Sequence, residues 1–396
     1  MCESVGLRKC VKCPEPGTLA GLDPSKASYC KPCFIQMVKH KFSSTIGKRR
    51  LYKDGEKRET LIVFEGDGPS AFLLSLISQG LRADAHKRLT LIPTVMVLLT
   101  VTDEEAIAFV KRRVENFKDV VDARWIFVHI SSIFGNFDDL DELNSIGNVE
   151  SIAKWERVLN ACLTESVRNE FVRLSRALIC VRVARRLGVN KVMMSDSADN
   201  LAKCVIYSLA FARGSSISCL SGAVDKTYPH VSIIRPLREI SNKEIALLNR
   251  FENSDRFIIH VDGSENCKHG LSVQSATSEF VDNLQVEGFR ATITTILSTA
   301  TKLQSISRKK TRCQFCSALF QSELDDERFV SEFVCLFFFC YLSIRLRPMC
   351  LSVQLFHLIG SSVLIIVANT EPPEHIMVVP ANVLGNNILT AVSVQV

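Results

Sequence analysis

Residues 61–80, Leu61-Ile-Val-Phe-Glu-Gly-Asp-Gly-Pro-Ser-Ala-Phe-Leu-Leu-Ser-Leu-Ile-Ser-Gln-Gly80, predict a strand, a tight loop and a helix. Leu61 to Phe64 favour a buried strand, and two glycines and a proline then turn the chain. Apolar residues recur at helical spacing from Ala71 to Ile77, with Ser70 as the predicted N-cap. In an α/β sheet, this arrangement brings a nucleotide phosphate to a helix N-terminus.

The composition is that of a globular protein with no strong bias toward one class of partner. The chain has 396 residues, enough for one large core or two smaller ones, and 23% of them are charged. Its 48 basic and 42 acidic residues leave a net charge of +6. Because this excess is mild, nucleic-acid binding would require local clusters of basic side chains.

Fifteen cysteines are present, and four of them form two Cys-x-x-Cys pairs near the N-terminus. Cys10/Cys13 and Cys30/Cys33 are separated by sixteen residues, a spacing typical of a zinc ribbon. Four thiolates can close a tetrahedral site, which a segment with little apolar area needs in order to fold. A thioredoxin-like redox pair is the alternative, although it requires only one such motif. Since no secretory leader precedes the pairs, we expect a reducing, cytosolic location.

A basic helix is predicted directly after the second cysteine pair. Its apolar stripe consists of Phe34, Ile35, Val38, Phe42 and Ile46. A charge run on such a helix is often only a solvated face, but its position beside a zinc module favours contact with phosphate. The candidate RNA contacts are Lys39, Lys41, Lys48, Arg49 and Arg50.

Strands and helices alternate along the next part of the chain. Residues 89–99 and 125–130 are apolar and β-favouring, and residues 103–117 between them have helical spacing. This alternation predicts an α/β fold with a parallel sheet covered on both faces. Residues 134–148 are acidic and are predicted to form a surface loop.

The longest predicted helical region spans residues 151–188 and ends at Gly188 as a C′ residue. A second basic cluster lies on it, which either packs through salt bridges or forms another basic surface. After it, a predicted strand at 191–194 leads into the loop 195–200, where open α/β sheets bind their ligands. Further helices are predicted at 242–251 and within 280–303. The arginines of the second cluster are Arg168, Arg173, Arg176, Arg182, Arg185 and Arg186.

Several short motifs occur in an order that resembles one known family. They are the Cys-x-x-Cys pairs, His40-Lys41-Phe42, Gly68-Pro69-Ser70, Lys191-Val-Met-Met-Ser-Asp-Ser, Leu209-Ala-Phe-Ala-Arg-Gly214, Arg235-Pro-Leu-Arg238, Lys243-Glu-Ile and Cys313-x-x-Cys316. Over about residues 8–320, the chain resembles the cytoplasmic tRNA 2-thiolation protein 2 family. The resemblance implies the fold of the PP-loop, or adenine nucleotide α-hydrolase-like, ATP pyrophosphatases.

The resemblance also implies a reaction and partners. It implies a heterodimer with a catalytic PP-loop subunit, in a complex that adenylates the wobble uridine 34 of the tRNAs for Lys, Glu and Gln. Sulfur then comes from a thiocarboxylated ubiquitin-related modifier. The expected cofactor is structural zinc, with the candidate ligands Cys10, Cys13, Cys30, Cys33, Cys313 and Cys316.

The loop after the first strand departs from the pattern of catalytic relatives. Those enzymes carry Ser-Gly-Gly-x-Asp-Ser, whose N–H groups and hydroxyls hold the pyrophosphate of ATP. Both serines, the first paired glycine and the aspartate are absent from the equivalent residues 66–71, and Asp67 would repel phosphate. The loop 195–200 also lacks the histidine of the family's Gly-His-Asn-x-x-Asp motif. ATP turnover is therefore not expected, and the degenerate phosphate loop comprises Gly66, Asp67, Gly68, Pro69 and Ser70.

Four parts of the chain are predicted. A zinc-ribbon-like module with a basic helix at 1–50 precedes a degenerate PP-loop α/β domain at 51–310, a partial Cys-x-x-Cys module at 311–328 and an atypical hydrophobic tail at 329–396. Residues 349–368 are long and apolar enough to span a bilayer. Because composition and family pattern break together near Val330, we favour a sequence artefact over a membrane anchor. Cys335 and Cys340 are therefore doubtful ligands of a second metal site.

Three functions follow from these patterns. The leading hypothesis is a noncatalytic tRNA-binding and scaffolding subunit of a cytosolic tRNA thiolase. The alternatives are an active ATP-dependent sulfurtransferase or amidotransferase-like enzyme on the same fold, and a zinc-ribbon nucleic-acid adaptor. None of the remaining cysteines is assigned a catalytic role, and four are interpreted as core residues: Cys162, Cys180, Cys204 and Cys219.

Overall fold

A computed structural model describes most of residues 8–303 and four strands of the tail. By its internal contacts the chain forms two compact units, the first comprising 1–156 and 162–321 and the second 157–161 and 322–396. Within 8–303, the residues left undescribed are 22–26, 49–50, 53–56, 86–87, 136–148, 163, 212, 261–271, 288 and 290. Residues 136–148 of the predicted acidic loop therefore lie outside the described residues, as do Arg49, Arg50, Cys313 and Cys316.

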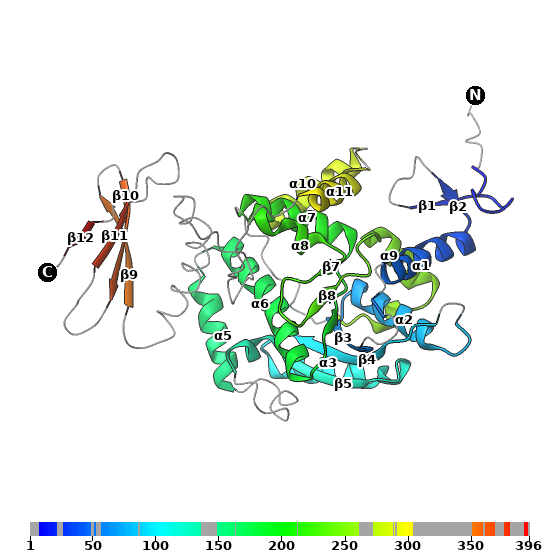
Figure 1. Cartoon of the computed structure of the whole chain (residues 1–396), viewed down its shortest axis with the longest axis horizontal. Coiled ribbons are helices and arrows are strands. Elements are labelled where there is room, and N and C mark those ends of the chain that lie inside the picture. Colours follow the sequence, from blue (N-terminus) through cyan, green and yellow to red (C-terminus); the bar gives the residue numbers. More distant parts are fainter. Residues whose placement is uncertain are drawn as a thin grey trace. The chain divides into compact units, whose positions relative to one another are not determined.

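A six-stranded sheet with the order β5-β4-β3-β6-β8-β7 forms the centre of the first unit (Figure 1). Neighbouring strands are parallel except at one edge, where β7 pairs antiparallel with β8. This arrangement confirms the predicted α/β fold with a parallel sheet. The strands are β3 (Glu59–Phe64), β4 (Ile92–Leu99), β5 (Arg124–His129), β6 (Lys191–Met193), β7 (Val224–Asp225) and β8 (Ser232–Ile234).

Helix α2 (Gly68–Leu81) follows β3 and begins earlier than predicted. Its N-cap is Asp67, whose carboxylate accepts a hydrogen bond from the Ser70 N–H at 2.9 Å. The prediction of Ser70 as the N-cap was wrong, because the aspartate carboxylate caps the preceding turn. Pro69 fits that first turn, where its fixed φ favours the helix and a missing N–H removes no intrahelical hydrogen bond.

Helices α1 (Lys31–Lys48), α2, α3 (Glu104–Glu115) and α9 (Asn242–Phe251) contribute to one large apolar cluster with β3 and β4. The predicted stripe on α1 is confirmed, since four of its members are buried there: Phe34, Val38, Phe42 and Ile46. Aromatic rings extend this core, with Phe64 and Phe117 in edge contact at 5.7 Å between centroids. Because β3 lies in this core, the loop that follows it has a fixed position.

The region 151–188 forms two helices rather than one, α5 (Val149–Ala161) and α6 (Glu165–Arg186). The prediction of one continuous helix was wrong because Thr164 starts a new helix as its N-cap, accepting from the Val167 N–H. Gly188 has φ +68°, which confirms it as the C′ residue in the left-handed region. Helix α6 contacts β6, and its arginines approach the strand ends.

A smaller apolar cluster joins helices that follow the second half of the sheet. It is formed by α7, α10 and α11, with Leu201, Val281 and Leu297 among its buried residues. The helix predicted at 242–251 is α9, and both of its predicted ends are confirmed. The remaining bounds are α7 (Ala198–Ala210), α8 (Ile217–Ser221), α10 (Val273–Val286), α11 (Thr292–Lys302), and the 3-10 turns η1 (Lys118–Val120), η2 (Ile130–Phe134), η3 (Gly214–Ser216) and η4 (Asp255–Phe257).

The second unit contains an antiparallel sheet of the order β12-β11-β10-β9. The apolar stretch 349–368, which is long enough to span a bilayer as a helix, instead holds two paired strands. Among the described residues, no helix has the length and apolar character needed to cross a membrane. The strands are β9 (Leu351–Leu358), β10 (Ser361–Ala368), β11 (Ile376–Pro380) and β12 (Val392–Val394).

Candidate functional site

The structure brings the four N-terminal cysteines together. Their sulfur atoms all lie within 4.8 Å of one another, with Cys13 Sγ 3.5 Å from Cys30 Sγ and 3.7 Å from Cys33 Sγ. A zinc ion bound at about 2.3 Å holds its thiolates roughly 3.8 Å apart, by tetrahedral geometry. A 4Fe–4S cluster separates its thiolates further, because four irons lie between them. The donor set Cys10, Cys13, Cys30 and Cys33 therefore fits one tetrahedral ion. We call residues 8–30 together with Cys33 the cysteine module.

A small hairpin positions these ligands. Strands β1 (Leu19–Ala20) and β2 (Ser28–Tyr29) pair antiparallel, and the Val11 N–H donates to the Ser28 carbonyl at 3.0 Å. Gly17 is required where the chain passes close to Ser28, since a Cβ on residue 17 would lie 2.7 Å from the Ser28 hydroxyl oxygen. Cys33 belongs to the first turn of α1. The four-cysteine cluster and the basic helix α1 are therefore structurally continuous.

The acidities of the thiols differ across the cysteine module. Burial raises the pKa of Cys10, but hydrogen bonds from the backbone of Cys30, Lys12 and Cys13 outweigh it and lower the pKa to about 6. Hydrogen bonding with Cys30, together with burial, raises the pKa of Cys33 to about 12. Four adjacent sulfurs cannot all carry negative charge without a cation, so metal binding must release protons.

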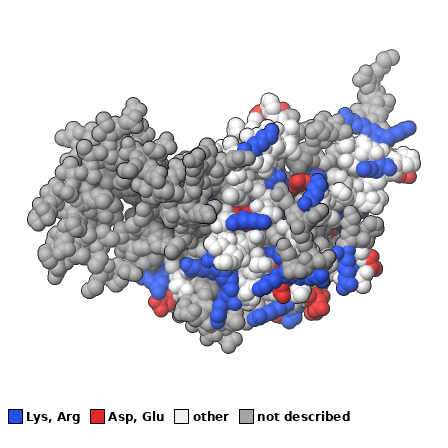
Figure 2. Space-filling view, viewed as in Figure 1, with Lys and Arg blue, Asp and Glu red and all other residues white. Residues whose placement is uncertain are grey.

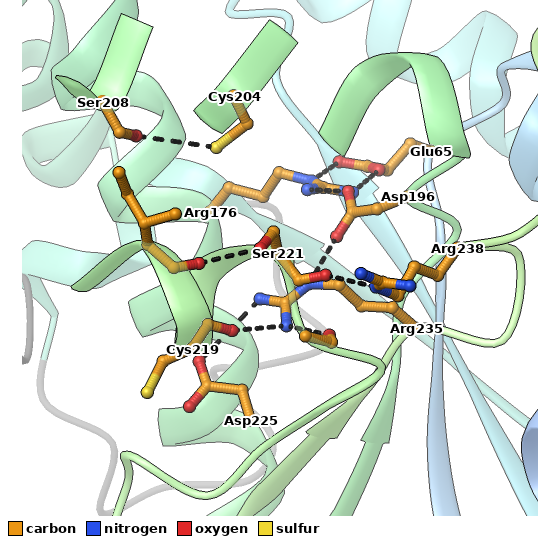
Figure 3. A network of polar contacts seen from close by, with 12 residues as sticks. Glu65, Arg176, Asp196, Cys204, Ser208, Cys219, Ser221, Asp225, Arg235 and Arg238 are labelled. Carbon is orange, nitrogen blue, oxygen red and sulfur yellow. Dashed lines mark hydrogen bonds and ion pairs between the residues drawn. The ribbon is translucent and has the colours of Figure 1, made fainter. Parts of the chain in front are cut away.

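A network of partly buried charges lies at the edge of the sheet where the strands end (Figure 3). Arg176 of α6 forms a two-pronged ion pair with Glu65, which follows β3, at 2.5 Å for each contact. The same guanidinium donates to Asp196, after β6, at 2.9 Å. Arg235, after β8, donates to the other Asp196 oxygen at 3.1 Å. We call Glu65, Arg176, Asp196 and Arg235 the strand-end network.

The two carboxylates of the strand-end network have different electrostatic environments. Burial raises the pKa of Glu65, although Arg176 opposes this rise. Burial also acts on Asp196, but Arg176 and Arg235 together outweigh it and lower the pKa of that carboxyl. Arg235 gains further support from the carbonyls of Cys219 and Gly222, each at 3.1 Å. The charges are therefore paired within the protein rather than directed at a ligand.

Two donors of the loop between β3 and α2 bind within the loop, and a third is missing. Pro69 has no N–H, and both the N–H and the hydroxyl of Ser70 donate to Asp67. Gly66 adopts φ +78°, and its carbonyl accepts from the Ile259 N–H at 2.8 Å. Asp67 thus acts as a helix cap, a role that the sequence interpretation of this residue did not include.

Polar side chains of the second loop, at 195–200, are also hydrogen-bonded within the protein. Ser197 caps α7 by accepting from the Asn200 N–H at 3.2 Å. Asp199 accepts from the Asn242 N–H at 2.8 Å, which links α7 to the start of α9. The cavity beside the first loop has room for only about 50 Å³ and is partly lined by Ile259. Ligand pockets usually provide at least about 300 Å³.

The candidate RNA contacts on α1 have different surroundings. Lys39 pairs with Glu252 and donates to Gln79, and Lys41 pairs with Glu244 at 2.7 Å. These two lysines attach α1 to the α/β core. Lys48 is exposed, whereas Arg49 and Arg50 lie outside the described residues.

The second basic cluster mainly packs against the protein. Arg168 and Arg173 pair with Glu165 and Glu170 on the same helix, and Arg176 belongs to the strand-end network. The sequence left open whether this cluster packs through salt bridges or forms a basic surface. Salt-bridged packing is correct for Arg168, Arg173 and Arg176. Sequence reasoning did not identify Glu65 as a network member. A charged residue directly after a fully apolar strand was the available signal, because such a residue requires a buried partner.

Replacing Arg176 by leucine should leave the partly buried Glu65 without a cation and Asp196 with Arg235 alone. We expect a loss of about 3 kcal/mol in the free energy of unfolding near neutral pH. Without Arg176, burial raises the folded-state pKa of Glu65 further above its unfolded value, so the loss should shrink as the pH falls toward 5. Urea unfolding of wild type and variant at several pH values measures this. An equal loss at every pH would contradict it, and Arg185→Leu, at an exposed contact with the Pro229 carbonyl, serves as the control.

Comparisons with known proteins identify relatives of this chain. A family model for cytoplasmic tRNA 2-thiolation protein 2 matches residues 272–332. The protein of that name from Caenorhabditis elegans is 37% identical over 314 residues, which cover 78% of this chain and 89% of the relative. The one from Caenorhabditis briggsae is 34% identical, covering 78% and 88%.

A solved structure shares the fold of the chain. It is the U34-tRNA thiolase NcsA from Methanococcus maripaludis with its 4Fe–4S cluster, with a TM-score of 0.55 and 18% identity over 84% of this chain and 97% of that one. The likeness confirms the PP-loop fold. The word cytoplasmic in the relatives' names agrees with the expected cytosolic location. The identity and coverage of these relatives show that this chain belongs to the cytoplasmic tRNA 2-thiolation protein 2 family.

Proposed function

We propose that this chain is a noncatalytic, tRNA-binding subunit of a tRNA thiolase complex. In that complex a catalytic PP-loop partner would form a heterodimer with this chain and activate the wobble uridine 34 of the tRNAs for Lys, Glu and Gln. A thiocarboxylated ubiquitin-related carrier would supply the sulfur. Family membership supports the role in tRNA 2-thiolation, and the likeness to a U34-tRNA thiolase supports the fold on which it rests.

The strand-end network is the observation that carries the noncatalytic assignment. A phosphate-binding edge needs free N–H groups and uncompensated positive charge. Here Arg176 and Arg235 are held by Glu65 and Asp196, and Asp67 takes the Ser70 N–H. The edge has the architecture of a nucleotide site, but its polar groups bind each other.

The noncatalytic assignment predicts that this chain releases no pyrophosphate from ATP, with or without tRNA. In a reconstituted thiolation reaction with its partner, Ser70→Ala should change the rate by less than about twofold, because the hydroxyl contacts only its own loop. Pyrophosphate release is measured with radiolabelled ATP, and the thiolation rate is measured from the amount of thiolated tRNA formed. Pyrophosphate release by this chain alone, lost on Ser70→Ala, would establish it as an active ATP-dependent enzyme instead. Asp67→Asn, which keeps a capping side chain, is the matched control.

We further propose that the cysteine module holds structural zinc. Its sulfur separations suit one tetrahedral ion, and its thiol acidities imply that binding releases protons. Zinc would tie the hairpin β1–β2 to the first turn of α1. It would supply no chemistry beyond this link.

Zinc removal should unfold the cysteine module without unfolding the sheet. We expect about one zinc per module by elemental analysis, reduced in Cys13→Ser, with faster hydrogen exchange confined to residues 8–30. The metal-loaded form should lose its ion as the pH falls, because protons compete for the thiolates. Iron instead of zinc in anaerobically purified protein would contradict the assignment. Cys180→Ser, a change at a buried thiol outside the module, is the control.

We propose that the tRNA surface includes the exposed cations of the cysteine module and α1. Lys9, Lys12, Lys31 and Lys48 are exposed, and Lys31 also lies 4.5 Å from the ring of Phe251. Figure 2 shows lysine and arginine side chains on several parts of one face. Of the original candidates, Lys48, Arg49 and Arg50 remain in this proposal. Lys39 and Lys41 become structural residues because they are already paired.

Reversing Lys9, Lys12 and Lys48 to glutamate should weaken tRNA binding. The dependence of affinity on salt should also become less steep, by about one unit of slope for each phosphate that the protein no longer neutralises. Titration of labelled tRNA at several salt concentrations measures both. Lys118→Glu changes the charge of a partly exposed residue that pairs with Glu115, and it should leave binding unchanged. Equal effects in both variants would show a general charge effect and no defined surface.

A further inference from the structure

A second cavity lies between the cysteine module and helix α11, away from the strand-end network. It has a volume of about 480 Å³, within the range of about 300–1,000 Å³ found for ligand pockets. Three parts of the first unit form its walls: the cysteine module through Tyr29, α1 through Met37 and Lys41, and α11 through Leu297. We call it the α1–α11 pocket. None of the roles assigned above uses it.

The apolar part of the wall suits a flat ring. Tyr29 and Met37 lie on the side of the module and α1, and Ile293 and Leu297 line the side of α11. An aromatic ring and a thioether both make favourable contacts with planar π-systems. Tyr29 is half-buried, so part of its ring remains accessible.

The polar part of the α11 wall offers acceptors. Thr294, Ser298 and Thr301 all line the pocket, and their spacing places them on one side of the helix. Each hydroxyl donates to a carbonyl of its own helix, at 2.8, 3.0 and 2.8 Å respectively. Because the hydroxyl protons are used in these bonds, the hydroxyl oxygens can only accept hydrogen bonds from a ligand in the pocket. They therefore favour a ligand that carries N–H donors.

A guanidinium is fixed at the rim of the pocket. Arg238 lines the pocket and donates to the carbonyls of Ser221 and Leu297, at 2.6 and 3.0 Å, which hold the side chain in one position. A guanidinium stays protonated at any physiological pH, and its planar set of donors suits phosphate oxygens. Glu239 also lines the pocket, but it is exposed and its charge is screened by water and salt. A ligand with an anionic group would therefore bind with that group toward Arg238.

We propose that the α1–α11 pocket binds one unstacked nucleotide of a single-stranded segment of RNA. A planar base with N–H donors fits between Tyr29 and the hydroxyls of α11, and its phosphate fits Arg238. Proteins that recognise RNA loops commonly hold splayed bases on aromatic side chains in this manner. The inference rests on the proposed tRNA-binding function and names the part of this chain that contacts the RNA.

The test measures the affinity of the full chain, in its complex with the catalytic partner, for a tRNA transcript. Tyr29→Leu should weaken binding about tenfold or more, the loss expected for one base–aromatic stack. Tyr29→Phe keeps the ring and should bind within about twofold of wild type. Ser298→Trp fills the pocket from α11 and should also weaken binding. Because Tyr29 adjoins Cys30, the zinc content of each variant is measured to confirm that the cysteine module is intact.

Photo-crosslinking locates the contact independently. A tRNA carrying 5-bromouridine should crosslink to Tyr29 or Met37 in wild type, and this crosslink should disappear in Ser298→Trp. If wild type binds tRNA but Tyr29→Leu and Ser298→Trp bind equally well, the pocket proposal fails while the proposed function stands. If wild type in the complex binds no tRNA, both fail. Crosslinks of the tRNA to other parts of this chain, with none to Tyr29 or Met37, would also overturn it.

Discussion

The pairing of Arg176 with Glu65 and Asp196 is the constraint on which the centre of the molecule depends. These residues come from α6, the end of β3 and the end of β6, so one guanidinium fixes three segments that are distant in sequence. Partly buried charges of this kind are stable only when each has a partner with good geometry. The arrangement holds the strand ends together where a nucleotide-binding relative of this fold would hold a ligand.

A second set of contacts joins the cysteine module to this centre through α1. Lys39 and Lys41 pair with Glu252 and Glu244 at the two ends of α9, and Glu244 also closes the capping box of that helix with Ser241. Asn249 of α9 in turn donates to the Gly68 carbonyl at the start of α2. The cysteine module, helix α1 and the loop between β3 and α2 are therefore connected through α9.

Local sequence pattern predicted an element correctly where the pattern was compatible with only one structure. The apolar run before Glu65 and the helical spacing of residues 103–117 predicted buried elements, because alternation of β and helical periods leaves few other folds. The cysteine spacing predicted that four thiols would meet, since the hairpin between them is short. Pattern failed at residues 151–188, where Thr164 interrupts two helices whose apolar stripes look continuous, and at Ser70, where Asp67 was the stronger cap.

The sequence by itself determined the parallel α/β fold and the meeting of four thiols, because each depends on residue type at short spacing. Only the tertiary structure decided what the charged residues do. Whether Lys41 meets RNA or Glu244, and whether Arg176 meets solvent or Glu65, depends on segments that are 203 and 111 residues apart. Electrostatic pairing acts through space, so a basic residue in a sequence cannot be assigned to a partner until the fold places that partner beside it.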